Sequence, residues 1–121
     1  MASNKDIGRK GEELARIYLE SKAYVILELN WRFSKAEIDI IAKDKEVLVF
    51  VEVKTRSYNY YGEPEDFISE NKVSVLTDAA AVYANSIGHE WEIRFDIISI
   101  ITKGEYHELK HFKDVFFEGW Q

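Results

Sequence analysis

The chain has 121 residues, of which 46% are hydrophobic and 31% charged, with a net charge of −6 and no cysteine. This length suits one domain spanning residues 1–121, and the composition excludes a disordered chain, a disulfide scaffold and a thiolate metal site. The acidic balance disfavours a general nucleic-acid binder, although the acidic excess lies beyond residue 56. The N-terminus lacks a signal-peptide pattern and no apolar run could span a membrane, so we expect a soluble cytoplasmic protein.

The first half of the chain predicts a helix followed by strands. The helix is capped by Ser3 or Asn4 and extends to about Lys22, with apolar and small residues at a period of 3.6. β-branched and aromatic residues then predict three strands, at residues 24–33, 37–42 and 47–55. The polar turn at 43–46 makes the second and third strands an antiparallel hairpin.

The second half predicts a loop, a helix and two further strands. Residues 56–71 contain many polar groups and are interpreted as a long loop, which in compact domains is often functional. Residues 70–86 form a helix that stops at Gly88, and strands follow at 91–101 and 105–112. The fold class is therefore α/β, with a central mixed sheet flanked by helices in the order α-β-β-β-α-β-β.

Ionisable residues occupy a strand that otherwise looks buried. In "VFVEVKTR" (49–56), Glu52 and Lys54 lie two positions apart, and burying such groups is costly without compensation. A two-residue turn at Asp44 and Lys45 would place Asp39 opposite Phe50. Because side chains alternate faces, one face would then hold Glu37, Asp39, Glu52 and Lys54, and the other Ile38, Ile40, Val51 and Val53.

Two interpretations of this charged face stand side by side. Asp39 and Glu52 would be diagonal neighbours roughly 7–8 Å apart at the backbone, close enough for their carboxylates to hold Mg²⁺ or Mn²⁺. Alternatively, the charges are solvated cross-strand pairs on a half-exposed hairpin. Leu48 and Phe50 share the face of Glu52, which favours a covered strand whose charged end opens into a cleft. The three histidines, His89, His107 and His111, are interpreted as surface residues rather than as zinc ligands.

Asp39 followed by Glu52-Val53-Lys54 after a short hairpin resembles the PD-(D/E)XK nuclease signature. The surrounding segments strengthen this likeness: "GRKGEELARIYL", "NWRFSKAEIDIIAKD", "LVFVEVKTR" and "FDIISI". In this order the chain is similar to the YraN-like family of small proteins, which have a restriction-endonuclease-like fold related to archaeal Holliday junction resolvases. Ala36 replaces the glycine usual before Glu-Ile-Asp, and Ile38 replaces a proline frequent in the wider signature.

The resemblance implies a catalytic role for four residues. Asp39, Glu52 and the main-chain carbonyl of Val53 would bind Mg²⁺ or Mn²⁺, and Glu12 would complete the metal site. Lys54 would position or deprotonate the attacking water. No small-molecule cofactor is implied.

Other residues are weaker candidates. Arg56 and Lys72 would contact phosphates, although a solvated helix lysine is the alternative for Lys72. Tyr60, in a loop with two further tyrosines, would stack on unpaired bases or else pack within its loop. Glu37 is either an outer carboxylate of the site or a surface residue at a strand end. The apolar tail "DVFFEGW" would suit a homodimer interface.

Three hypotheses follow for the function. The first is a metal-dependent endonuclease acting on DNA, in particular on branched or structured DNA. The second is a nucleic-acid-binding or scaffold module that keeps the nuclease fold with little or no cleavage, which the net charge of −6 favours. The third is a structural protein whose hairpin charges are solvated pairs.

Overall fold

The computed structural model describes residues 4–58 and 70–115, with the side chains of 4, 5 and 70–72 left out. Its elements are α1 (Asn4–Ser21), β1 (Val25–Phe33), β2 (Ala36–Asp44), β3 (Val47–Ser57), α2 (Glu70–Ser86), β4 (Ile93–Lys103) and β5 (Tyr106–Phe112). The predicted element order is confirmed, while most of the predicted loop, at 59–69, lies outside the described residues. Neither helix combines the length and the apolar character needed to cross a membrane.

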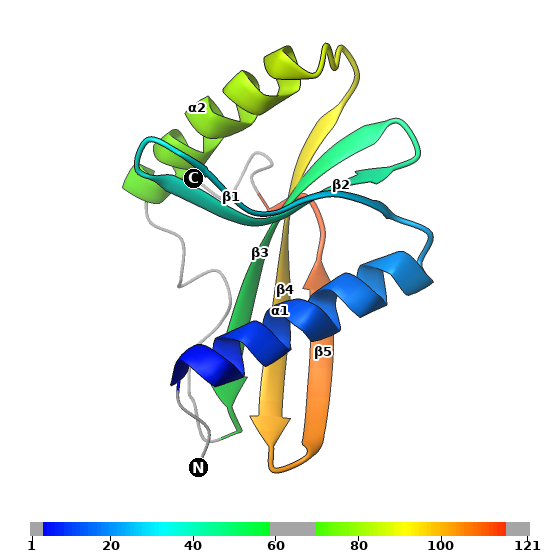
Figure 1. Ribbon diagram of the computed structural model, residues 1–121, viewed down its shortest axis with the longest axis vertical. Helices are drawn as coiled ribbons and strands as arrows, with labels where there is room; N and C mark the ends of the chain where they lie inside the picture. The colour runs from blue at the N-terminus through cyan, green and yellow to red at the C-terminus, as the bar shows by residue number, and fades with distance from the viewer. Residues whose placement is uncertain (1–3, 59–69, 116–121) are drawn as a thin grey trace.

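The strands form one mixed sheet in the order β1-β2-β3-β4-β5, in which only β3 and β4 run parallel. Two neighbouring parallel strands need a long crossover, and α2 lies within the connection that joins them. Figure 1 shows α1 crossing in front of β3, β4 and β5, with α2 at the other end beside β1 and β2. The α/β class is confirmed, and the arrangement is consistent with a restriction-endonuclease-like fold.

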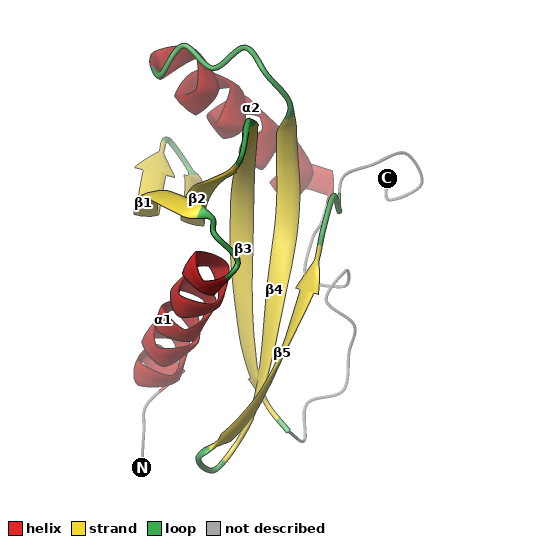
Figure 2. Ribbon diagram, turned by 90° about the vertical axis from the view of Figure 1, so that its right-hand side faces the viewer, coloured by secondary structure: helices red, strands yellow, loops and turns green. Residues whose placement is uncertain are grey.

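Two separate clusters of buried apolar side chains hold the helices against the sheet. The cluster under α2 contains Ala36, Ile38, Ile41, Leu48, Phe50, Leu76, Ala79, Ala80, Tyr83 and Ala84. The cluster under α1 contains Ala15, Leu19, Tyr24, Ile40, Ala42, Val49, Val51, Ile98 and Ile100. Each helix thus covers its own part of the sheet, and Figure 2 shows α1 beside β3 and α2 across the upper ends of β3 and β4.

Glycines shape each helix at one point. A Cβ built on Gly11 would lie 1.9 Å from Thr55 Oγ1 and 3.0 Å from Thr55 Cβ, so only glycine lets α1 lie this close to β3. Gly88 has a φ of +67° and terminates α2, as the sequence predicts. The close contact at Gly11 matters for the site because the next residue is Glu12.

The predicted register of the β2–β3 hairpin is wrong by two residues. Asp44 pairs with Val47, so the turn is formed by Lys45 and Glu46, and Lys45 has a φ of +57°. Because the shift is even, the residues of β2 and β3 that were predicted to share a face still do so where the two strands pair. Glu52 and Lys54, two positions apart on β3, share a side in any register. Both turns are short and polar, and the alternation of the strands does not distinguish them.

The predicted sharing of a face by Ile38 and Ile40 is also wrong. Ile38 packs in the cluster under α2 and Ile40 in the cluster under α1. The β2–β3 pairs run from Asp44↔Val47 to Ile40↔Val51, whereas the β1–β2 pairs continue to Phe33↔Ala36. The β2–β3 ladder therefore ends at Ile40, and the β1–β2 ribbon separates from β3 between the two isoleucines. Figure 1 shows the ribbon turning away from β3.

Candidate functional site

The predicted site residues of the first half of the chain gather around one cavity of about 570 Å³. It is lined by Ile7, Gly8, Glu12, Asp39, Glu52, Val53, Lys54, Thr55, Arg56 and Ser57. The helix α1 supplies Glu12, β2 supplies Asp39, and β3 supplies the remaining predicted residues. The side chain of Lys72 and the whole of Tyr60 lie outside the described residues, so their roles stay predictions.

Asp39 takes the place of a backbone acceptor where β2 leaves β3. The Val53 backbone N–H donates a hydrogen bond of 2.8 Å to Asp39 Oδ2. A partly buried backbone N–H at the end of a ladder needs an acceptor, and the side chain of Asp39 provides it. This bond fixes the Asp39 carboxylate beside Glu52 and Val53, although the predicted register is incorrect.

Glu52 and Lys54 form an ion pair on the edge of the same cavity. Lys54 Nζ lies 3.0 Å from Glu52 Oε1, and the two side chains are 18% and 17% exposed. Glu52 Oε2 is buried as well. Side chains with so little exposure are not solvated surface pairs, so this geometry argues against the third hypothesis from the sequence. The strand is apolar at Phe50 and ionic from Glu52 onward, as its alternation predicts.

Glu37 behaves differently from Asp39. Its carboxylate lies 3.4 Å from Arg32 Nη2, and the two side chains are 45% and 75% exposed. Exposed pairs of this kind contribute little to stability. Glu37 thus fits the alternative of a surface residue at a strand end, although its charge still acts on Asp39.

The carboxylates of the cavity repel one another, and the pKa of Asp39 reflects this. Burial, together with the charges of Glu12, Glu52 and Glu37, raises the pKa of Asp39 to about 7, and the hydrogen bond from Val53 only partly opposes the rise. Burial and the charge of Glu37 likewise raise the pKa of Glu12, while hydrogen bonds with the Asp39 and Asn30 side chains lower it. Close, desolvated carboxylates of this kind favour a bound proton or a bound cation.

The chemistry of the donors fits a magnesium or manganese ion. Glu12, Asp39 and Glu52 offer carboxylate oxygens around one cavity, and Mg²⁺ prefers oxygen ligands. Across the described residues, however, no three His, Cys, Asp or Glu side chains already form a group that could hold a metal ion. Mg²⁺ is commonly bound by one or two carboxylates, with waters and substrate phosphates completing the shell. The cavity fits that kind of site rather than a closed protein cage.

A second cavity, of about 290 Å³, is lined by two of the same carboxylates, Glu12 and Asp39. It is lined by Arg9, Glu12, Glu13, Arg16, Leu29, Asn30 and Asp39. Glu12 and Asp39 thus belong to both cavities. The sequence interpretation missed Arg9 and Asn30. Asparagine inside a strand is unfavourable, and this mismatch within "NWRF" was the available signal for Asn30.

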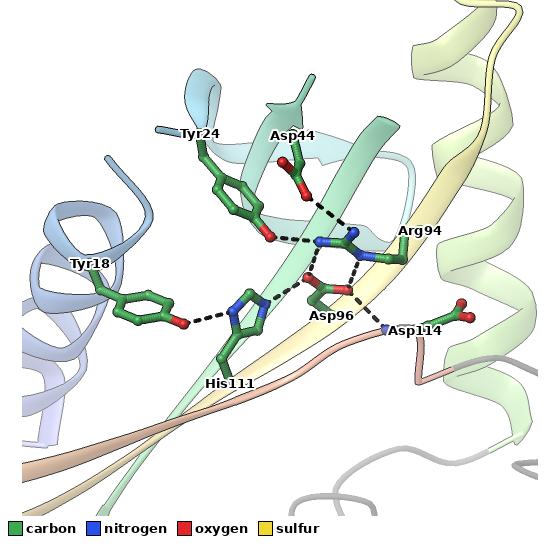
Figure 3. A network of polar contacts seen from close by, with 7 residues as sticks. All are labelled: Tyr18, Tyr24, Asp44, Arg94, Asp96, His111 and Asp114. Carbon is green, nitrogen blue, oxygen red and sulfur yellow. Dashed lines mark hydrogen bonds and ion pairs between the residues drawn. The ribbon is translucent and has the colours of Figure 1, made fainter. Parts of the chain in front are cut away.

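A polar network away from the cavities corrects the interpretation of His111 as a surface residue. The His111 side chain is only 5% exposed, and its Nε2 donates to Asp96 Oδ2 at 2.7 Å. Its Nδ1 shares a hydrogen bond of 3.1 Å with the Tyr18 hydroxyl. Figure 3 shows these side chains converging from α1, β4 and β5. The pairing was invisible in the sequence because Asp96 and Tyr18 are distant from His111 along the chain.

Arg94 completes this network from the other side. Arg94 Nε and Nη2 donate to the two oxygens of Asp96, each at 2.9 Å, and Nη2 also donates to the Tyr24 hydroxyl at 2.7 Å. The Asp114 backbone N–H donates to Asp96 Oδ1 at 3.0 Å. Burial acts to raise the pKa of Asp96, but the hydrogen bonds from His111 and Arg94 outweigh it and lower the pKa. The Asp96 carboxylate on β4 therefore binds groups from its own strand, from β5 and from the segment that follows β5.

The fold and the cavity define an α/β protein with a restriction-endonuclease-like arrangement and an acidic site that contains a lysine. The sequence profile of the "Uncharacterised protein family UPF0102" matches residues 11–100, and the chain belongs to this family. A UPF0102 protein of Flavobacterium psychrophilum is 45% identical over 117 residues, covering 97% of this chain and 98% of the relative. UPF0102 proteins of Clostridium botulinum and Geobacter metallireducens are each 41% identical, over 93% of this chain and 95% and 93% of their own. UPF0102 is the YraN-like family, so the resemblance that the sequence motifs indicated is confirmed.

Proposed function

We propose that the protein is a metal-dependent endonuclease that hydrolyses phosphodiester bonds in DNA, with branched or structured DNA as its substrate. The observation that carries the proposal is the convergence of Glu12, Asp39 and Glu52 from three elements on one cavity that also contains Lys54. A structural protein has no need for three neighbouring carboxylates, one of them with its pKa raised to about 7 by burial and repulsion. Perturbed groups in a cavity are typical of functional sites.

The predicted site residues that line the cavity each have a role in this proposal. Asp39, Glu52 and Glu12, with the Val53 carbonyl, bind Mg²⁺ or Mn²⁺. The ion would supply activation of water and neutralisation of charge at the phosphate. As the ammonium in its ion pair with Glu52, Lys54 would position the attacking water through its N–H donors; only the neutral amine could accept the proton of that water.

The two cavities favour a polymer as the substrate. Both cavities are lined by Glu12 and Asp39, so a chain that passes from one cavity to the other would cross these carboxylates. Arg56 lines one cavity and Arg9 the other, and each would contact a phosphate of the bound chain. Lys72 and Tyr60 remain proposed DNA contacts.

Assembly and location are part of the same proposal. A homodimer would present two such cavities, as cleavage of two strands at a DNA branch requires. The cytoplasm remains the proposed compartment because it gives access to DNA in bacteria, the source of the relatives named above.

A DNA-binding module without cleavage is the second candidate. Among the described residues no ready group of three metal ligands exists, and the net charge is −6. Both observations favour a protein in which the nuclease fold persists and the chemistry is weak or lost. The two candidates differ in the effect of Asp39→Asn, which abolishes cleavage under the first and only changes DNA binding under the second.

A calorimetric titration with Mn²⁺ tests the metal site itself. The wild type is compared with the Asp39→Asn, Glu52→Gln double variant, and with Asp78→Asn, Glu90→Gln as a control that removes two exposed carboxylates. We expect the wild type and the control to bind Mn²⁺ and the first double variant not to bind. Equal binding by all three proteins would contradict a metal site at Asp39 and Glu52.

A further inference from the structure

Asn30 has a backbone conformation that its place in β1 does not require. Its φ is +51° within the strand Val25–Phe33. Left-handed backbone is unfavourable for residues other than glycine, and asparagine is among those that tolerate it best. Strained positions persist where the surrounding structure enforces them, and they cluster at functional sites.

The position of Asn30 is directly opposite Asp39. The β1–β2 pairs are Leu29↔Ile40 on one side and Trp31↔Ile38 on the other, so Asn30 and Asp39 face each other between them. This is also the point where β2 leaves β3 and where the Asp39 side chain accepts the Val53 N–H. The left-handed backbone at Asn30 therefore lies at the bend where β2, which carries Asp39, separates from β3.

The side chain of Asn30 acts on the other carboxylate. Asn30, Glu12 and Asp39 line the same cavity, and the Asn30 side chain is near enough to Glu12 to act against the rise of its pKa. Glu12 follows Gly11, the residue at which α1 lies close to Thr55 of β3. Asn30 thus lines a cavity together with both carboxylates and lies opposite Asp39 across the ribbon.

We infer that Asn30 is a positioning residue that holds Glu12 and Asp39 in the arrangement required for the metal ion. This inference rests on the proposed function, because the arrangement has a purpose only if a cation binds there. A purely structural role would need only an amino acid that tolerates the left-handed conformation. A positioning role also needs the side-chain amide.

The substitution Asn30→Gly separates the two roles, because glycine adopts a φ of +51° without strain and has no amide side chain. Ser34→Gly is the matched control, since Ser34 has a φ of +55° in the turn of the same ribbon. Mn²⁺ affinity is measured by calorimetry, and the hydrogen exchange of the Val53 amide is measured in the metal-free proteins. Exchange at Val53 reports directly on whether Asp39 is in place.

We expect Asn30→Gly to bind Mn²⁺ about 10–100-fold more weakly than the wild type, which is the usual effect of losing an outer partner of a metal ligand. Exchange at Val53 should also be faster, and Ser34→Gly should leave both unchanged. If the wild type binds Mn²⁺ and Asn30→Gly binds it equally well, the inference is overturned and the proposed function stands. If the wild type does not bind Mn²⁺, the proposed metal site fails. The rate of hydrogen exchange at the Val53 amide then tests by itself whether Asn30 positions Asp39. Faster exchange in Asn30→Gly than in Ser34→Gly then supports the positioning of Asp39, and equal exchange overturns it.

Discussion

Replacing Asp96 by asparagine should destabilise the protein severely while preserving the shape of the side chain. The Asp96 carboxylate is fully buried and is bound by Arg94 and His111, whose side chains are 13% and 5% exposed. Asparagine would leave the Arg94 charge buried, with the Asp44 carboxylate, 3.4 Å away, as its remaining ion-pair partner among the described residues. Removing one partner of a buried ion pair costs about 3–5 kcal/mol. Because asparagine retains one acceptor oxygen, we expect about 3 kcal/mol, more than a hundredfold in the unfolding equilibrium.

Urea unfolding at pH 7, followed by the fluorescence of the three tryptophans, measures this loss. Asp78→Asn on the exposed side of α2 is the control for charge removal. The midpoint should fall with an unchanged denaturant slope. The pKa of Asp96 is lowered from 3.8 by its partners, so the stability that it contributes is present above pH 3.8 and is lost as the pH falls through the lower folded value. The difference between wild type and variant should therefore shrink in acid. A loss below about 1 kcal/mol at pH 7 would refute this account of the network.

Three further predictions concern the site. Gly11→Ala should cost about 1–3 kcal/mol in urea unfolding, because its Cβ would overlap Thr55, and adding Thr55→Ala should recover part of the loss; an undisturbed single variant would contradict the contact. The pKa of Asp39 is raised to about 7, so its contribution to stability is complete below pH 3.8 and is lost as the pH rises through 7. Asp39→Asn should remove this pH dependence and increase the melting temperature of the metal-free protein at pH 8. Identical profiles of melting temperature against pH for the wild type and the variant would contradict the raised pKa. Lys54→Met should abolish DNA cleavage while retaining Mn²⁺ binding in calorimetry, and loss of both would reassign Lys54 to the structure of the site.

The sequence predicted the site through short-range patterns. Glu52 and Lys54 lie two positions apart on one strand, so the alternation alone places them together. Their ionic character beside Phe50 indicated a strand that opens into a cavity, and the geometry agrees. Asp39 was assigned to the same site because it matches the nuclease motif, even though its predicted partner across the hairpin was wrong.

The missing parts depend on contacts between distant segments and on backbone geometry. The turn at Lys45 and Glu46 could not be distinguished from its neighbour by polarity. The bend that separates Ile38 from Ile40 coincides with the left-handed backbone at Asn30. A single asparagine inside a strand signals an irregularity there, but it does not specify a φ angle. The burial of His111 depends on Asp96 on the neighbouring strand, so the spacing of the histidines alone suggested a solvated residue.

Cleavage of end-labelled four-way junction, flap and single-stranded DNA in the presence of Mn²⁺ tests the central claim most directly. The wild type should cut at least the branched substrate, Asp39→Asn should cut none, and the exposed control Asp78→Asn should cut as the wild type does. Identical products from the wild type and Asp39→Asn, or binding of the junction without cleavage by a wild type that binds Mn²⁺, would contradict the nuclease assignment.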